Sequence, residues 1–160
     1  MSQNALLTGT AVNLWNQIIE RAGKTLDAFT DDQLQLEVAP GKNRVFYVLG
    51  HLTAAHDQLL PLLRLGERRY PQLDVFLNQP DRAQSDPISA ADLRKAWAEV
   101  NQAITAAVST LTPEQWLERH SAISEEDFTR EPHRNRLSVF ASRTTHAAYH
   151  HGQVRLVQPK

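Results

Sequence analysis

Apolar residues recur at three- and four-residue spacing in four segments of the chain, which is the period that places them on one face of an α-helix. This spacing predicts helices over residues 10–28, 42–65, 89–110 and 137–157. In the first of them the apolar face consists of Val12, Trp15, Ile18, Ile19, Ala22 and Leu26. No segment shows the sustained apolar–polar alternation of a strand. The pattern therefore predicts an all-α chain.

Long helices of similar length predict a four-helix bundle, and the connection lengths refine its topology. The connection over residues 66–88 contains Pro71, Pro80 and Pro87 and is long enough to travel the length of a bundle. It permits a long crossover, so that the second and third helices need not be antiparallel neighbours.

Two similar capping patterns follow the first and the third helix. Thr30 precedes Gln33 by three residues, and Thr112 precedes Gln115 by the same interval, as in a capping box. Pro113 also suits the first position of a short helix. The repetition fits a design of two halves, each with a helix, a capped turn and a histidine-bearing helix. It fits equally well the general similarity of helix caps.

Composition narrows the class of protein. The chain has 160 residues, a length that predicts one domain over residues 1–160. It has 17 basic and 18 acidic side chains and a formal net charge of -1. This balance indicates neither a nucleic-acid-binding surface nor a polybasic membrane-binding patch. It has no cysteine, so any metal must be held by nitrogen and oxygen. No signal peptide or membrane-length apolar stretch is evident, and we expect a cytoplasmic protein. Trp15, Trp97 and Trp116 are expected to pack in the core or between helices, although one of them could lie at an interface.

The histidine pair His146 and His150 is the strongest chemical signal. Four residues apart in a helix, the two imidazoles share one face and can bind one metal ion; neutral imidazole suits zinc, nickel, copper and iron. A pair of this kind can also arise by chance at a surface. Here it lies in register with Val139, Val154 and Val157 on the inward side of the helix. Burying an unpaired imidazole is costly, which favours a metal.

A third ligand is expected from the second predicted helix. His51 and His56 are five residues apart and point in directions that differ by about 140°, so they are not expected to bind the same ion. His51 shares its face with apolar residues and is the preferred ligand. His56 lies beside Asp57 and Gln58 and is predicted to be solvated.

The remaining histidines have weaker claims. His120 and His133 lie among charged residues, which predicts surface positions for both. His151 points about 100° away from His150 and cannot share its ion easily, although it could lie beside the site.

Three neutral histidines leave coordination positions open to water or substrate, which is typical of a catalytic metal site. The zincin motif is excluded because position 147 is alanine, and no Glu-x-x-His pair of a di-iron bundle occurs. No general base is obvious. Tyr149, His151 and Arg143 are candidate catalytic or substrate-holding residues, and each is equally open to a structural role. A buried Arg143 would need an anion, such as a substrate carboxylate.

With His51 in the segment VLGHLTAAH (residues 48–56) and the later pattern His-x-x-x-His-x-Gly-Gln, the sequence resembles the DinB-like superfamily. The segment PGKNR at residues 40–44 resembles the lead-in of that family. The superfamily includes metal-dependent hydrolases and low-molecular-weight thiol S-transferases. The resemblance implies a metal triad of His51, His146 and His150 and an up-down-down-up bundle. It also implies a zinc, nickel, iron or manganese ion and a homodimer.

The resemblance also gives roles to the Gly-Gln pair. Gly152 is expected to let a neighbouring helix approach closely. Gln153 is expected to form a hydrogen bond to a metal ligand or to cap the helix, unless it is simply solvated.

The leading functional hypothesis is a metal-dependent enzyme that activates a low-molecular-weight thiol for S-transfer or a water molecule for hydrolysis of a small-molecule substrate. The alternative is a non-catalytic, stress-related binding module in which the metal is structural or absent. A third possibility is a metal-free scaffold that retains the histidines as relics.

Overall fold

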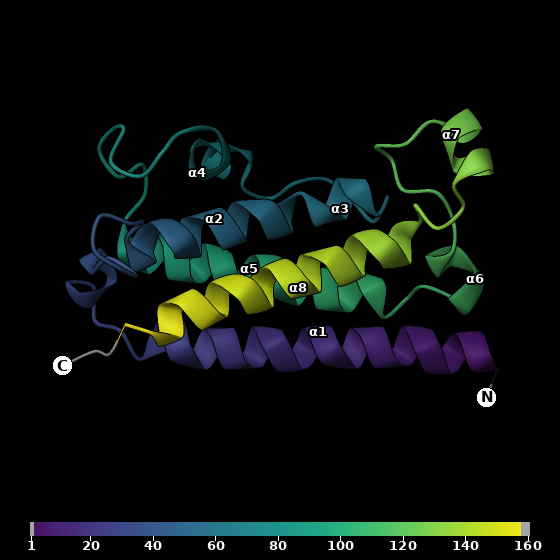
Figure 1. Cartoon of the computed structure of the whole chain (residues 1–160), viewed down its shortest axis with the longest axis horizontal. Helices are drawn as coiled ribbons and strands as arrows, with labels where there is room; N and C mark the ends of the chain where they lie inside the picture. Colours follow the sequence, from purple (N-terminus) through teal and green to yellow (C-terminus); the bar gives the residue numbers. More distant parts are fainter. Residues whose placement is uncertain (1, 158–160) are drawn as a thin grey trace.

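Four long helices dominate residues 2–157, the part of the chain that the computed structural model describes (Figure 1). Their bounds are α1 Gln3–Asp27, α2 Val45–Asp57, α5 Ala90–Val108 and α8 Arg136–Arg155. Within these residues no strand occurs, which confirms the predicted all-α class. None of the described helices is long and apolar enough to cross a membrane.

The helix directions confirm the up-down-down-up topology. In Figure 1, α1 and α8 run in one direction, while α2 and α5 run in the opposite direction. The main packing pairs are α1 with α8 and α2 with α5. The connection after α2 returns along the bundle through η2 (Pro71–Asp74) and α4 (Val75–Asn78), so that α5 starts at the same end as α2. This is the crossover that the length of the connection permitted.

The first two predicted helices differ in extent from the helices in the structure. Helix α1 starts at Gln3 rather than near residue 10, because the Ser2 side chain caps it by accepting a hydrogen bond from the Ala5 N–H at 3.2 Å. The second predicted helix is divided into α2 and α3 (Leu59–Leu62). Pro61 has no N–H to donate to the carbonyl of Asp57, so the helical hydrogen-bond ladder is interrupted there.

Short capped helices occupy the connections: η1 (Gln33–Gln35), α6 (Pro113–Trp116) and α7 (Glu125–Arg130). At both predicted caps the hydrogen bonds are reciprocal. The Thr30 N–H donates to Gln33 Oε1 at 2.8 Å, and the Gln33 N–H donates to Thr30 Oγ1 at 3.2 Å. Thr112 and Gln115 repeat this arrangement at 2.9 and 3.2 Å. The similarity of the two caps is therefore structural, and Pro113 does begin a short helix.

The core lies between the long helices and contains all three tryptophans. Trp15 and Trp116 are fully buried, and Trp97 is nearly so. These positions confirm the prediction for the tryptophans.

Two ionic clusters anchor the crossover to α2. At the start of α2, Arg44 contacts Asp81 at 2.6 Å and Asp86 at 2.8 Å. At the end of α2, the fully buried Asp57 accepts hydrogen bonds from the Arg68 guanidinium. It also accepts hydrogen bonds from the backbone N–H groups of the two residues that follow Arg68. A buried carboxylate needs such partners. The two anchors hold the intervening segment, including α4, against α2.

Candidate metal centre

Helices α2 and α8 bring His51, His146 and His150 together. The Nε2 atom of His146 lies 3.1 Å from the Nε2 atoms of both His51 and His150. One ligand nitrogen from each residue falls within 4.8 Å of the other two, and all three side chains are half-buried. The structure thus groups the three histidines that the sequence singled out, and this group could hold a metal ion.

Hydrogen bonds on the far side of two rings determine their tautomers. The Phe76 carbonyl, 3.1 Å from His51 Nδ1, can only accept, so Nδ1 carries the proton and Nε2 carries a lone pair. His150 Nδ1 lies 2.8 Å from the amide oxygen of Gln153, which assigns the same tautomer. Two lone pairs therefore point toward His146 Nε2.

This donor set fits a cation better than it fits a hydrogen-bonded histidine cluster. A proton on His146 Nε2 can serve only one of the two facing lone pairs, whereas a metal ion accepts electron density from all three nitrogens. In a tetrahedral zinc site, Zn–N bonds near 2.0–2.1 Å separate neighbouring nitrogens by roughly 3.3–3.5 Å. The two 3.1 Å spacings are close to that separation.

Burial keeps His146 and His150 in the neutral form that metal ligation needs. Burial is the main cause that lowers the pKa of His146 to about 4, with smaller contributions from His150, His51 and the Arg143 charge. Burial also lowers the pKa of His150, although the Gln153 hydrogen bond opposes that shift. Both imidazoles are therefore neutral near pH 7.

Of the two expectations for the Gly-Gln pair, the one for Gln153 is confirmed and the one for Gly152 is wrong. Gln153 does contact a histidine of the cluster, and its Nε2 donates to the Tyr149 hydroxyl at 3.1 Å. Tyr149 is exposed, with its ring centroid 5.0 Å from that of His150. At Gly152 an added Cβ would meet nothing within 4 Å, so no helix approaches there. The close approach occurs instead at Gly50, where a Cβ would lie 2.6 Å from the Phe76 ring.

A cleft of about 140 Å³ opens beside the histidines. It is lined by Asn43, Tyr47, Val48, Leu77 and two of the three histidines, His51 and His150. These lining residues include no carboxylate. The cleft gives a small molecule direct access to the histidine cluster.

Sequence reasoning missed Tyr47, although its position could have indicated it. Its ring stacks on that of His51 with centroids 6.4 Å apart, and its hydroxyl donates to the Gln79 carbonyl at 2.6 Å. Tyr47 lies four residues before His51, so helical spacing places both on one face. No sequence signal indicates that the Phe76 carbonyl contacts His51, because every residue type has a backbone carbonyl.

The prediction that His56 is solvated is wrong. Its side chain is fully buried between Trp15 and Trp97, and its Nδ1 lies 2.9 Å from Asn101 Oδ1. Burial lowers its pKa to about 3, so the imidazole is neutral and belongs to the core. Its polar neighbours in sequence were misleading, because the groups that bury it come from α1 and α5.

The other histidines lie outside the cluster. His151 Nε2 is 2.9 Å from Thr25 Oγ1, which places this side chain against α1. His133 is exposed, as predicted. His120 is only 9% exposed, so its predicted surface position is wrong; its Nδ1 accepts a hydrogen bond from the Ala122 N–H at 3.2 Å.

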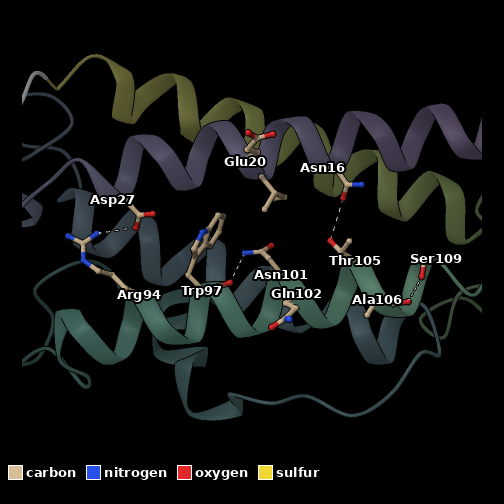
Figure 2. A pocket seen from close by; sticks show the side chains of 12 residues that line it. Asn16, Glu20, Asp27, Arg94, Trp97, Asn101, Gln102, Thr105, Ala106 and Ser109 are labelled. Carbon is tan, nitrogen blue, oxygen red and sulfur yellow. Dashed lines mark hydrogen bonds and ion pairs between the residues drawn. The ribbon is translucent and has the colours of Figure 1, made fainter.

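A separate groove of about 620 Å³ lies between α1 and α5 (Figure 2). Figure 2 shows Trp97 and Asn101 pointing into it and polar side chains along its length. The Asn101 side chain donates to the Trp97 carbonyl at 2.8 Å. None of the three clustered histidines lines this groove, so the histidine chemistry belongs to the smaller cleft.

Fold and site together define a class: an up-down-down-up helical bundle with three histidines converging from two helices. The family comparison agrees with this class. The chain matches the DinB superfamily over residues 14–154 and belongs to that superfamily. No curated protein matches the chain.

Proposed function

We propose that this protein is a metal-dependent enzyme that uses His51, His146 and His150 to hold a divalent transition metal and acts on a small-molecule substrate. The observation that supports this proposal best is the convergence of two unprotonated Nε2 atoms on a third, beside an open cleft. When bound, such an ion supplies positive charge that lowers the pKa of a low-molecular-weight thiol or of water. Zinc and nickel suit an all-imidazole site, and iron or manganese are alternatives.

The protein's own residues would position the reactants. The Phe76 carbonyl and Gln153 hold two imidazoles in the required tautomer, as hydrogen-bond partners of metal-bound histidines generally do. Asn43 and Tyr47 line the cleft and would contact a substrate there. Because no carboxylate lines the cleft, a substrate that carries its own acidic proton, such as a thiol, suits it better than one that needs a strong general base.

The proposal is tested by metal-dependent turnover. The stripped protein is loaded in turn with zinc, nickel, iron and manganese and supplied with a simple thiol and a chromogenic electrophile, or with ester and amide substrates alone. We expect thiol consumption that requires a metal and is lost in His51→Ala. Metal binding without turnover on either substrate set would instead favour the non-catalytic binding module.

Metal affinity should fall on acidification, because protons compete for the same nitrogens. Since burial lowers the pKa of His146 to about 4 and also lowers that of His150, these two ligands stay available below the ordinary histidine value of 6.5. Between pH 7 and pH 3.5 we expect a loss of about tenfold or more. Equilibrium dialysis with metal analysis measures the loss, and circular dichroism at each pH verifies the fold. A constant affinity over this range would contradict ligation by histidine.

A further inference from the structure

A second cleft contains an arginine, Arg143, whose side chain has no acidic partner among residues 2–157. This cleft has a volume of about 360 Å³ and lies between the end of α3 and the first turns of α8, with His120, Arg134, Ser142 and Arg143 among its lining residues. The Nε atom of Arg143 is buried and has no hydrogen-bond partner. Among the described residues no carboxylate pairs with Arg143, and burial lowers its pKa. The Nε–H of Arg143 therefore lacks the hydrogen-bond partner that a buried donor on a charged group needs.

The other polar groups of the cleft are also donors. His120 Nδ1 accepts from the Ala122 N–H, so in the neutral ring the proton lies on Nε2 and leaves a free donor. The neutral ring is favoured because burial, together with the charges of Arg134, Arg119 and Arg64, lowers the pKa of His120. Ser142 adds a hydroxyl group. The described lining residues include no acidic side chain.

We infer that this cleft is a binding site for the carboxylate of a small organic molecule, held mainly by the Arg143 guanidinium with His120 and Ser142 beside it. The charge balance favours a singly charged group. Arg134, the other cation that lines the cleft, already contacts Glu131 at 2.9 Å, whereas Arg143 has no acidic partner. A planar carboxylate also matches the fork of a guanidinium group.

Arg143 connects this cleft to the histidine cluster. It precedes His146 by three residues on the same helix, a rise of about 4.5 Å along the axis. Its charge contributes to the lowered pKa of His146, so the two side chains are within electrostatic reach. The assignment of the carboxylate to the substrate rests on the proposed function, whereas the existence of the binding site does not.

The test uses metal-free protein, so that its result is independent of the metal site. The Arg143 Nε–H signal is identified in ¹H–¹⁵N spectra by its absence in Arg143→Gln. The protein is then titrated with sodium propionate against sodium chloride at equal ionic strength. We expect a saturable shift of this signal with propionate only. Propionate binding, followed by the remaining shifted signals, should be weaker by about tenfold or more in Arg143→Gln. Arg143→Lys, which keeps the charge but loses the fork, should bind with intermediate affinity.

Arg130→Gln is the matched control, because Arg130 is exposed on α7 and already pairs with Asp127. Its propionate affinity should stay within about twofold of wild type, as for a surface charge. Equal affinity in wild type and Arg143→Gln, or no saturable shift, would overturn the site. Inorganic phosphate binding about tenfold more tightly than propionate would overturn the carboxylate assignment. Propionate binding by a protein that takes up no metal would support the site and refute only the proposed chemistry.

Discussion

Replacing His146 with alanine is expected to weaken metal binding by about 100-fold or more, since removing a ligand should cost at least as much as removing a hydrogen-bond partner of a ligand. His146 has this effect because its Nε2 lies 3.1 Å from the Nε2 atoms of both His51 and His150. The bundle should remain folded, because the core on either side of the site is formed by buried apolar residues of all four long helices. Equilibrium dialysis with mass-spectrometric metal analysis measures the affinity, and circular dichroism measures the fold.

His133→Ala provides the control for this experiment, because His133 is an exposed histidine outside the cluster. Its metal content should equal that of wild type. Wild-type protein stripped with a chelator should also keep its helical spectrum. If the stripped protein unfolds, the metal has a structural role, and the catalytic proposal loses its main support.

Replacing Gly50 with alanine is expected to destabilise the protein by about 1–3 kcal/mol, the usual cost of overpacking a core. The new methyl group would lie 2.6 Å from the Phe76 ring, which is itself buried against Phe46 and Tyr47. Because the contacted atoms include the ring Cγ, we expect relief of the contact to shift the backbone of Phe76 and with it the carbonyl that orients His51. Metal affinity should therefore fall by about tenfold as well. Urea denaturation and equilibrium dialysis measure the two effects.

Gly9→Ala is the matched substitution. Gly9 is also a helical glycine, in α1, and a Cβ there would meet nothing within 4 Å. Alanine should increase the free energy of unfolding by up to about 1 kcal/mol through helix propensity alone, with no change in metal affinity. If Gly50→Ala behaves in the same way, the contact between Phe76 and α2 does not control the site.

Residues in one helix were predictable because helical geometry is local. The spacing of His146 and His150 places both on one face whatever the rest of the chain does, and Gln153 reaches His150 within the same turn. The reciprocal caps at Thr30 and Thr112 were readable for the same reason. His51 required one further inference, from the apolar face of its own helix.

Residues whose surroundings come from other helices were not predictable in this way. His56 was predicted to be solvated from its neighbours in sequence, yet Trp15 and Trp97 cover it from α1 and α5. Gly152 was expected to be the site of close packing, but that site is Gly50, because the crossover presses Phe76 onto α2. In each case the surroundings of the residue are set by side chains from another element, which the neighbouring sequence does not indicate.

The sequence alone indicated the four long helices, their order and the histidines able to bind a metal, because apolar periodicity, caps and i,i+4 spacing act over a few residues. The tertiary structure decided how those histidines are held. The Phe76 carbonyl assigns the tautomer of His51 from 25 positions away, and Arg143 lies in a cleft with no acidic partner. Such contacts depend on where the crossover and the connection before α8 pack against the bundle. They join residues that are far apart in the sequence, so no periodic pattern of residues predicts them.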